Sequence, residues 1–132
     1  MNNLIIPDKE LSRVKFIQAH LLDAGQREPF LRYDGEMNQL THSRLLTDLV
    51  REFGIKLETA TLSGGEVIAK PKTDRYEICG AGRMDFKDGI FVFYGNSCSS
   101  SYVLGLNREH FRELREIDSR FRFRIDEETR MH

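Results

Sequence analysis

A histidine at the start of a predicted helix is the residue of this sequence best suited to chemistry. His42 follows Thr41, whose side chain can cap a helix N-terminus, in the segment LTHSRLLTDLVREFG. The partial positive charge of a helix start favours a neutral imidazole, and the unpaired amides beside it suit an anion such as phosphate. His42 is therefore a candidate base or nucleophile beside a bound phosphate. The plainer interpretation is a solvated helix-start residue without a chemical role.

A run of small polar residues from Gly95 to Ser101 is a second candidate site. Small residues permit tight turns that expose backbone amides, and exposed amides can bind an oxyanion. Cys98 lies in this run, but a cysteine phosphatase needs an arginine six residues later, where this chain has Leu104. The run therefore indicates anion binding rather than a cysteine nucleophile.

Metal-binding spacings are missing from the histidines and cysteines. These residues are His20, His42, Cys79, Cys98, His110 and His132. No two histidines have the separation typical of a zinc site, and the cysteines are too far apart for a CxxC motif. The sequence predicts no metal and no other cofactor. Two cysteines fit free thiols in a reducing compartment better than a disulfide framework.

Composition predicts one domain over residues 1–132, since 39% hydrophobic content in 132 residues suffices for one packed core. The net charge is −1, from 20 basic and 21 acidic side chains, so no overall field selects nucleic acid or an anionic membrane. The arginines near the C-terminus are matched by acidic residues, which also argues against nucleic acid. The start of the chain lacks a targeting pattern, and no segment reaches the ~20 apolar residues of a membrane span, so we expect a cytoplasmic protein.

The segment around His42 predicts a helix followed by a strand. Apolar residues recur at helical spacing on one face of this helix: Leu45, Leu46, Leu49, Val50 and Phe53. Gly54 is suited to the position after a helix C-terminus. From Ile55 to Leu62 the period changes to two, which predicts a strand ending in a Ser63–Gly65 turn.

Two structures compete for residues 9–24. Asp8 can cap a helix, Gly25 can end one, and the apolar residues between them include a set at helical spacing. The central part, VKFIQAHLL, also fits a central strand with both faces covered. Local rules favour the helix, and the strand stays open as the alternative.

The remaining pattern predicts an α+β fold: a mixed, mostly antiparallel sheet of about six strands, packed by two or three helices. Asp88-Gly89 between apolar runs is a strong hairpin signal, and Asn107 can cap a second helix. The expected strands lie near Leu31, Leu57, Ile68, Ile78, Val92 and Phe123. Residues 126–132 are expected to form a frayed polar tail.

Five segments together resemble the Janus/Ocnus family of phosphohistidine phosphatases. They are the Ile6-Pro7-Asp8 start, Lys15 in an apolar stretch, His42 opening a helix, Leu62-Ser63-Gly64-Gly65, and Tyr94-Gly95-Asn96-Ser97 ahead of the last helix and strand. The resemblance implies a small metal-independent enzyme with a mixed sheet and two helices. It spans most of the chain and is one of layout more than of identity.

The resemblance also implies roles for individual residues. His42 becomes the catalytic histidine and Lys15 a cation that positions the substrate. The phosphate-binding residues become Gly95, Ser97, Cys98 and Ser99, supported by Gly64 and Gly65. The partner is then a phosphorylated protein or a small phosphate compound. A non-catalytic binding module of the same fold is the alternative, because Glu66 stands where the family has an arginine.

We predict that phosphate or sulfate, titrated at millimolar concentration, shifts the NMR signals of the Ser97 to Ser101 amides first, because these amides bind the anion. Amides of the strand expected near Ile68 serve as the internal control. Unchanged signals in the loop would remove it from the anion site.

Overall fold

The computed structural model describes residues 2–36, 39–94, 102 and 104–126, which form a five-stranded sheet, a two-stranded sheet and two helices. The larger sheet has the order β2-β1-β5-β6-β7, antiparallel except for the parallel pair β6–β7. Its strands are β1 (Leu11–Asp23), β2 (Gln26–Tyr33), β5 (Tyr76–Lys87), β6 (Ile90–Tyr94) and β7 (Phe123–Asp126). The helices are α1 (His42–Glu52) and α2 (Arg108–Ile117), and the smaller sheet pairs β3 (Thr59–Thr61) with β4 (Val67–Ala69).

The predicted α+β class is confirmed, with a different distribution of strands. β4 matches the strand expected near Ile68, but it pairs with β3 in the smaller sheet and not with the described strands of the larger sheet. The strand expected from Ile55 to Leu62 is reduced to Thr59–Thr61, so Leu57 lies outside any strand. Leu57 and Ile55 instead pack as partly buried side chains against the core beneath α1. Ala60 and Leu62 pack against the same core, so the buried positions change phase within residues 55–62 and only the last part forms a strand.

The helix that local rules favoured over residues 9–24 is wrong, because Leu11–Asp23 is the long strand β1. β1 pairs with β2 along one edge and with β5 along the other, so its backbone donors and acceptors are used within the sheet. Every residue from Phe16 to Leu21 is buried. A mostly apolar run with few polar residues can satisfy helical spacing by chance, and the sheet partners decide between the two structures. Gly25, proposed as a helix stop, stands in the tight turn to β2.

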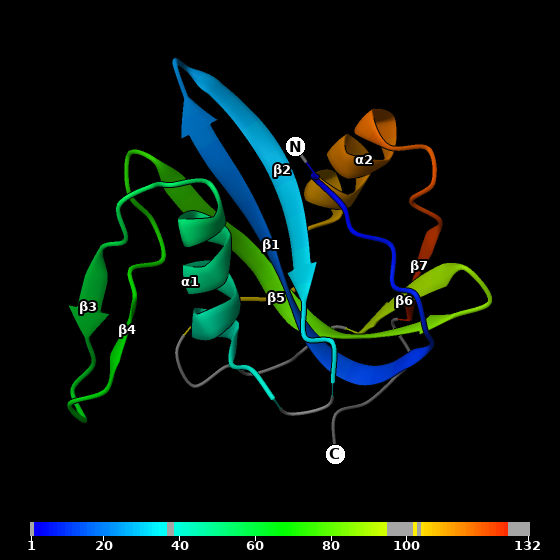
Figure 1. The fold of residues 1–132 in the computed structure, drawn as a ribbon, viewed down its shortest axis with the longest axis horizontal. Helices are drawn as coiled ribbons and strands as arrows, with labels where there is room; N and C mark the ends of the chain where they lie inside the picture. Colours follow the sequence, from blue (N-terminus) through cyan, green and yellow to red (C-terminus); the bar gives the residue numbers. More distant parts are fainter. Residues whose placement is uncertain (1, 37–38, 95–101, 103, 127–132) are drawn as a thin grey trace.

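The two helices cover opposite faces of the larger sheet (Figure 1). Side chains alternate along β1, so Ile17 and Ala19 join the core under α1 while Val14 and Phe16 join the core under α2. The α2 core is rich in aromatic rings, which include Phe16, Phe91, Phe93, Phe111 and Phe121. β1 therefore serves as the shared wall of two separate cores.

The local signals for helix ends and for one hairpin are confirmed. The Thr41 hydroxyl accepts from the Arg44 amide at 3.0 Å, and the Asn107 side chain accepts from the His110 amide at 3.0 Å. The Asp88-Gly89 turn joins β5 to β6. Such short-range rules succeed here because each needs only residues within the same few positions.

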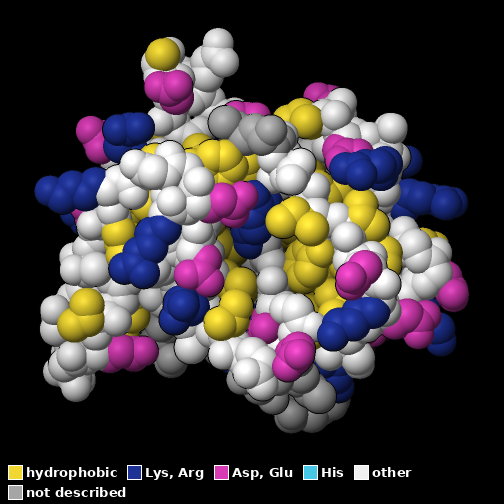
Figure 2. Space-filling model, in the orientation of Figure 1, with side chains coloured by type: hydrophobic (Ala, Val, Ile, Leu, Met, Phe, Trp, Pro, Cys, Tyr) yellow, Lys and Arg dark blue, Asp and Glu magenta, His cyan; other side chains and the backbone are white. Residues whose placement is uncertain are grey.

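The surface carries both signs of charge. Basic and acidic side chains are interspersed over the face in Figure 2, in agreement with the net charge of −1. No helix in the described part of the chain is long and apolar enough to span a membrane. Most of the tail expected over 126–132 lies outside the described residues, and Asp126 itself ends β7.

Leu46 on α1 is fully buried, at 0% exposure. We predict that Leu46→Ala lowers the free energy of unfolding by roughly 2–5 kcal/mol, because apolar transfer energy is lost and a cavity remains. Denaturant unfolding measures the change. Val67→Ala is the control, since Val67 is 61% exposed and its truncation should alter stability by about 0.5 kcal/mol or less. Equal midpoints for the two variants would contradict the packing described for α1.

Candidate functional site

A buried carboxylate fixes the chain where it enters α1. Asp34, 2% exposed, accepts hydrogen bonds from the amides of Glu36, Gln39 and Leu40 at 2.8–3.1 Å. Asp34 follows β2 directly, and its own amide donates to the Lys15 carbonyl at 2.9 Å. The helix start is thereby held against β1.

His42 is the first residue of α1 and its ring is buried, at 3% exposure. Nε2 lies 3.1 Å from the carbonyl oxygen of Gly82 on β5. Because a carbonyl oxygen only accepts, Nε2 carries the proton of this hydrogen bond. In the neutral ring the lone pair is therefore on Nδ1, which is the atom available as base or nucleophile.

Two cations lie close enough to His42 to influence its protonation. Burial lowers the pKa of His42, and the positive charges of Lys15 and Arg83 lower it further, while the hydrogen bond to Gly82 acts in the opposite direction. Lys15 and Arg83 are paired residues of β1 and β5. Three chain segments thus bring a neutral histidine and two cations together at the start of α1. The same charges favour an anion beside His42.

Tyr94, the residue before the predicted anion loop, lies close to this group. Tyr94, the last residue of β6, pairs with Arg83, and a Cβ added to Gly82 would lie 2.7 Å from the Tyr94 carbonyl oxygen. The Tyr94 backbone therefore lies against Gly82, the residue whose carbonyl accepts the hydrogen bond from His42. Gly95, Ser97, Cys98 and Ser99, which the sequence placed in the phosphate site, lie outside the described residues.

The predicted supporting residues Gly64 and Gly65 lie in the turn between β3 and β4, at the outer end of that hairpin (Figure 1). The Gly65 amide donates to the Leu62 carbonyl at 2.8 Å, which closes the turn. Of the site residues predicted from sequence, the structure therefore brings together His42 and Lys15. Arg83 was not predicted, although the alternation of β5 after Gly82 was a usable signal for its position.

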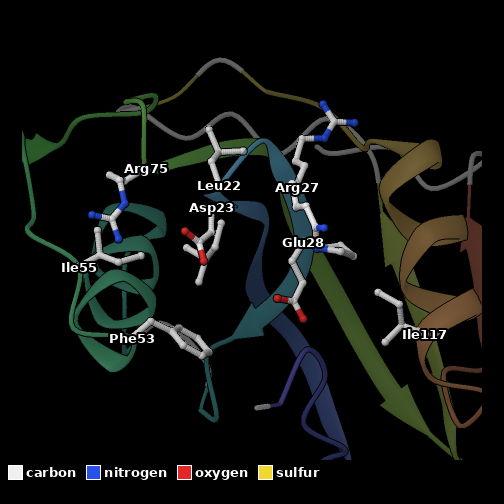
Figure 3. Close-up of a pocket in the computed structure, with 11 residues that line it drawn as sticks. Leu22, Asp23, Arg27, Glu28, Phe53, Ile55, Arg75 and Ile117 are labelled. Carbon is white, nitrogen blue, oxygen red and sulfur yellow. The ribbon is translucent and has the colours of Figure 1, made fainter.

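A pocket of about 480 Å³ opens elsewhere, around the β1–β2 hairpin (Figure 3). Phe53 and Ile55 line it beside α1, Ile117 lines it from α2, and Asp23 and Arg75 add opposite charges. His42 and Lys15 do not line it. This pocket has mixed walls and no convergent catalytic group, so the start of α1 remains the better candidate.

One cluster of metal-ligating side chains was missed by the sequence analysis. One ligand atom each of His20, Cys79 and His110 lies within 4.8 Å of the other two. These residues belong to β1, β5 and α2, so no spacing along the chain could show their proximity. The useful signal was the pairing of β1 with β5, which requires β1 to be recognised as a strand.

Comparisons with protein-family models, with curated proteins and with solved structures gave no match. The Janus/Ocnus resemblance therefore rests on the sequence segments quoted for it.

We predict that NMR titration gives His42 a pKa below 6.5, and that bound phosphate raises it, because an adjacent anion favours the imidazolium. As pH falls, His42 is protonated at a higher pH in the unfolded chain than in the folded one. The contribution of neutral His42 to the free energy of unfolding is therefore complete above about pH 6.5 and is lost as pH falls through the folded pKa. The model histidine value of about 6.5 is the reference. A His42 pKa of about 6.5 that ignores phosphate would contradict the site.

Proposed function

We propose that the protein is a histidine-dependent, metal-independent phosphohydrolase of the Janus/Ocnus type, acting on a phosphoamidate or a phosphate ester. The observation that carries the proposal is the convergence of His42 with Lys15 and Arg83. The strand formed by residues 11–23 supports the proposal, because it pairs Lys15 with Arg83. Arg83 supplies a cation that the sequence lacks after Gly65, where Glu66 stands.

The chemistry follows from the tautomer of His42. With Nε2–H donated to Gly82, the Nδ1 lone pair accepts a proton from the attacking water as the new oxygen–phosphorus bond forms. The bond from phosphorus to the leaving nitrogen or oxygen breaks, and the imidazolium returns the proton to that leaving atom. Lys15 and Arg83 stabilise the charge on the phosphoryl oxygens. The ligand is then a phosphorylated protein or a small phosphate compound.

A non-catalytic phosphate-binding module is the second candidate, favoured by the burial of His42. A side chain that is 3% exposed must gain exposure before its Nδ1 can meet a substrate. Binding of an anion by Lys15, Arg83 and backbone amides requires no such step. In that case His42 senses the anion through its pKa without turning anything over.

For the enzyme, we predict that His42→Ala reduces hydrolysis of a phosphohistidine peptide or a simple phosphate ester by a factor of ~100 or more, because proton transfer is lost. Lys15→Ala should chiefly weaken substrate binding and raise KM. Steady-state kinetics with inorganic phosphate release measures both. Matched controls are Arg44→Ala on the same helix, 61% exposed, and Lys87→Ala at the exposed end of β5.

Turnover that survives His42→Ala unchanged would overturn the catalytic proposal. Absent turnover in the parent chain, together with phosphate binding that Lys15→Ala weakens, would support the binding module instead. Thermal unfolding of each variant establishes that the fold is retained.

A further inference from the structure

We propose that His20, Cys79 and His110 form a zinc-binding site between β1, β5 and α2, on the sheet face opposite α1. This site goes beyond the proposed phosphohydrolase activity and does not depend on it. It would bind one divalent, thiophilic metal ion and fasten α2 to the centre of the sheet.

The geometry is close to that of a tetrahedral metal site. The candidate ligand atoms lie within 4.8 Å of one another. Zinc bonds of about 2.0–2.3 Å to nitrogen and sulfur require ligand atoms about 3.3–3.6 Å apart. A contraction of about 1 Å, within the reach of side-chain rotations, therefore brings the three atoms onto one ion. One thiolate and two imidazoles are donors that zinc accepts readily.

Cys79 stands at a bulge in β5. Gln18 pairs with Gly80 and Ala19 pairs with Ile78, so Cys79 is an extra residue between two regular pairs. Ile78 packs in the core under α1, and regular alternation leaves the next side chain on the other face. The Cys79 side chain therefore lies on the α2 face, beside His20 and His110.

His110 already has the hydrogen bonding of a metal ligand. Its Nε2 lies 3.0 Å from the Ala19 carbonyl and 3.1 Å from the Phe30 carbonyl, so Nε2 carries the proton. Ligating histidines commonly donate their second N–H to a backbone carbonyl, which fixes the tautomer. The lone pair is on Nδ1, which now accepts from Gln18 Nε2 at 3.2 Å. Zinc would replace that weak contact.

His20 contributes a buried nitrogen with unused capacity. The side chain is 2% exposed, and within the described part of the chain its Nδ1 is a buried polar atom without a hydrogen bond. Glu77 Oε1 lies 3.3 Å from Nδ1, outside hydrogen-bond geometry, and Glu113 Oε1 lies 3.3 Å from Nε2. Either carboxylate can orient the ring, and the other can complete the coordination. Nitrogen atoms of Arg27 lie 3.6 Å from Glu77 Oε1 and 3.9 Å from Glu113 Oε1.

Charged side chains surround the cluster. Glu77 and Glu113 lie within 3.9 Å of Arg27, and Glu77 also lies 3.9 Å from Lys72, so the two carboxylates stand against two cations. Burial, with Glu77 and Glu113 nearby, raises the pKa of Cys79 to about 12, so the free thiol is protonated and its proton leaves on metal binding.

The ion has a route to the site. Cys79 is only partly buried, Glu113 is 26% exposed, and Arg27 is 54% exposed. Arg27 and Ile117 form the side of the 480 Å³ pocket nearest α2 (Figure 3). A hydrated cation can therefore approach along the Arg27 side without unfolding of the sheet.

The test uses Co²⁺ as a spectroscopic substitute for zinc on the chelator-treated full chain. We expect one equivalent of Co²⁺ to give a thiolate-to-metal charge-transfer band and the intense visible bands of tetrahedral coordination, and Zn²⁺ to abolish both. Cys79→Ser should remove the charge-transfer band, and His20→Gln should weaken binding at least about tenfold. Cys98→Ser and His42→Ala are matched controls that should leave the spectrum unchanged.

A second measurement needs no variant, so it stands even if a substituted chain fails to fold. Zinc should protect Cys79, and not Cys98, from alkylation, as mapped by peptide mass spectrometry, and should raise the thermal midpoint of the parent chain. The proposal is overturned if Co²⁺ gives no charge-transfer band, if that band survives Cys79→Ser, or if zinc leaves Cys79 alkylation unchanged.

Discussion

The pairing of β1 with β5 is the constraint on which the other features of this protein depend. The two strands lie at the centre of the larger sheet, and each carries side chains for the cores on both faces. Their register brings Lys15 opposite Arg83 and His20 opposite Glu77. A slip of one residue would exchange the faces of every side chain on one strand, and would separate both pairs from α1 and α2. Both candidate sites are therefore consequences of one register.

The features predicted correctly from the sequence were those that depend on residues close together along the chain. The Thr41 and Asn107 caps and the Asp88-Gly89 hairpin need only neighbouring residues, and all three were predicted. β1 was mistaken for a helix because an apolar run of this length carries both periodicities, and only its partners distinguish them. The same error hid the cluster of His20 and Cys79 with α2, since their proximity exists only in the paired sheet.

Polar groups, as well as apolar ones, dock α2 on the sheet. Gln18 is fully buried, yet its side chain accepts from the Asn107 amide at 2.8 Å and donates to the Asn107 carbonyl at 2.7 Å. A buried amide left without partners would cost roughly 1–3 kcal/mol, so α2 can dock only where both bonds form. Phe111 stacks on Phe93 with ring centroids 4.2 Å apart, at the apolar end of the same interface. The Gln18 hydrogen bonds and the Phe93–Phe111 stacking fix the position of α2 along the sheet.

Two glycines of β5, Gly80 and Gly82, leave room for close contacts that a side chain would block. A Cβ at Gly80 would lie 2.1 Å from Gln18 Oε1, so only glycine leaves room for the side chain that anchors the start of α2. At Gly82 a Cβ would lie 2.7 Å from the Tyr94 carbonyl oxygen, while the Gly82 carbonyl accepts from His42 on the other side. A larger residue at Gly82 would push β5 away from β6, and one at Gly80 would displace the Gln18 side chain. Because one stretch of strand supports both α2 and His42, such a change would reach the cluster of His20, Cys79 and His110 and the surroundings of His42 together.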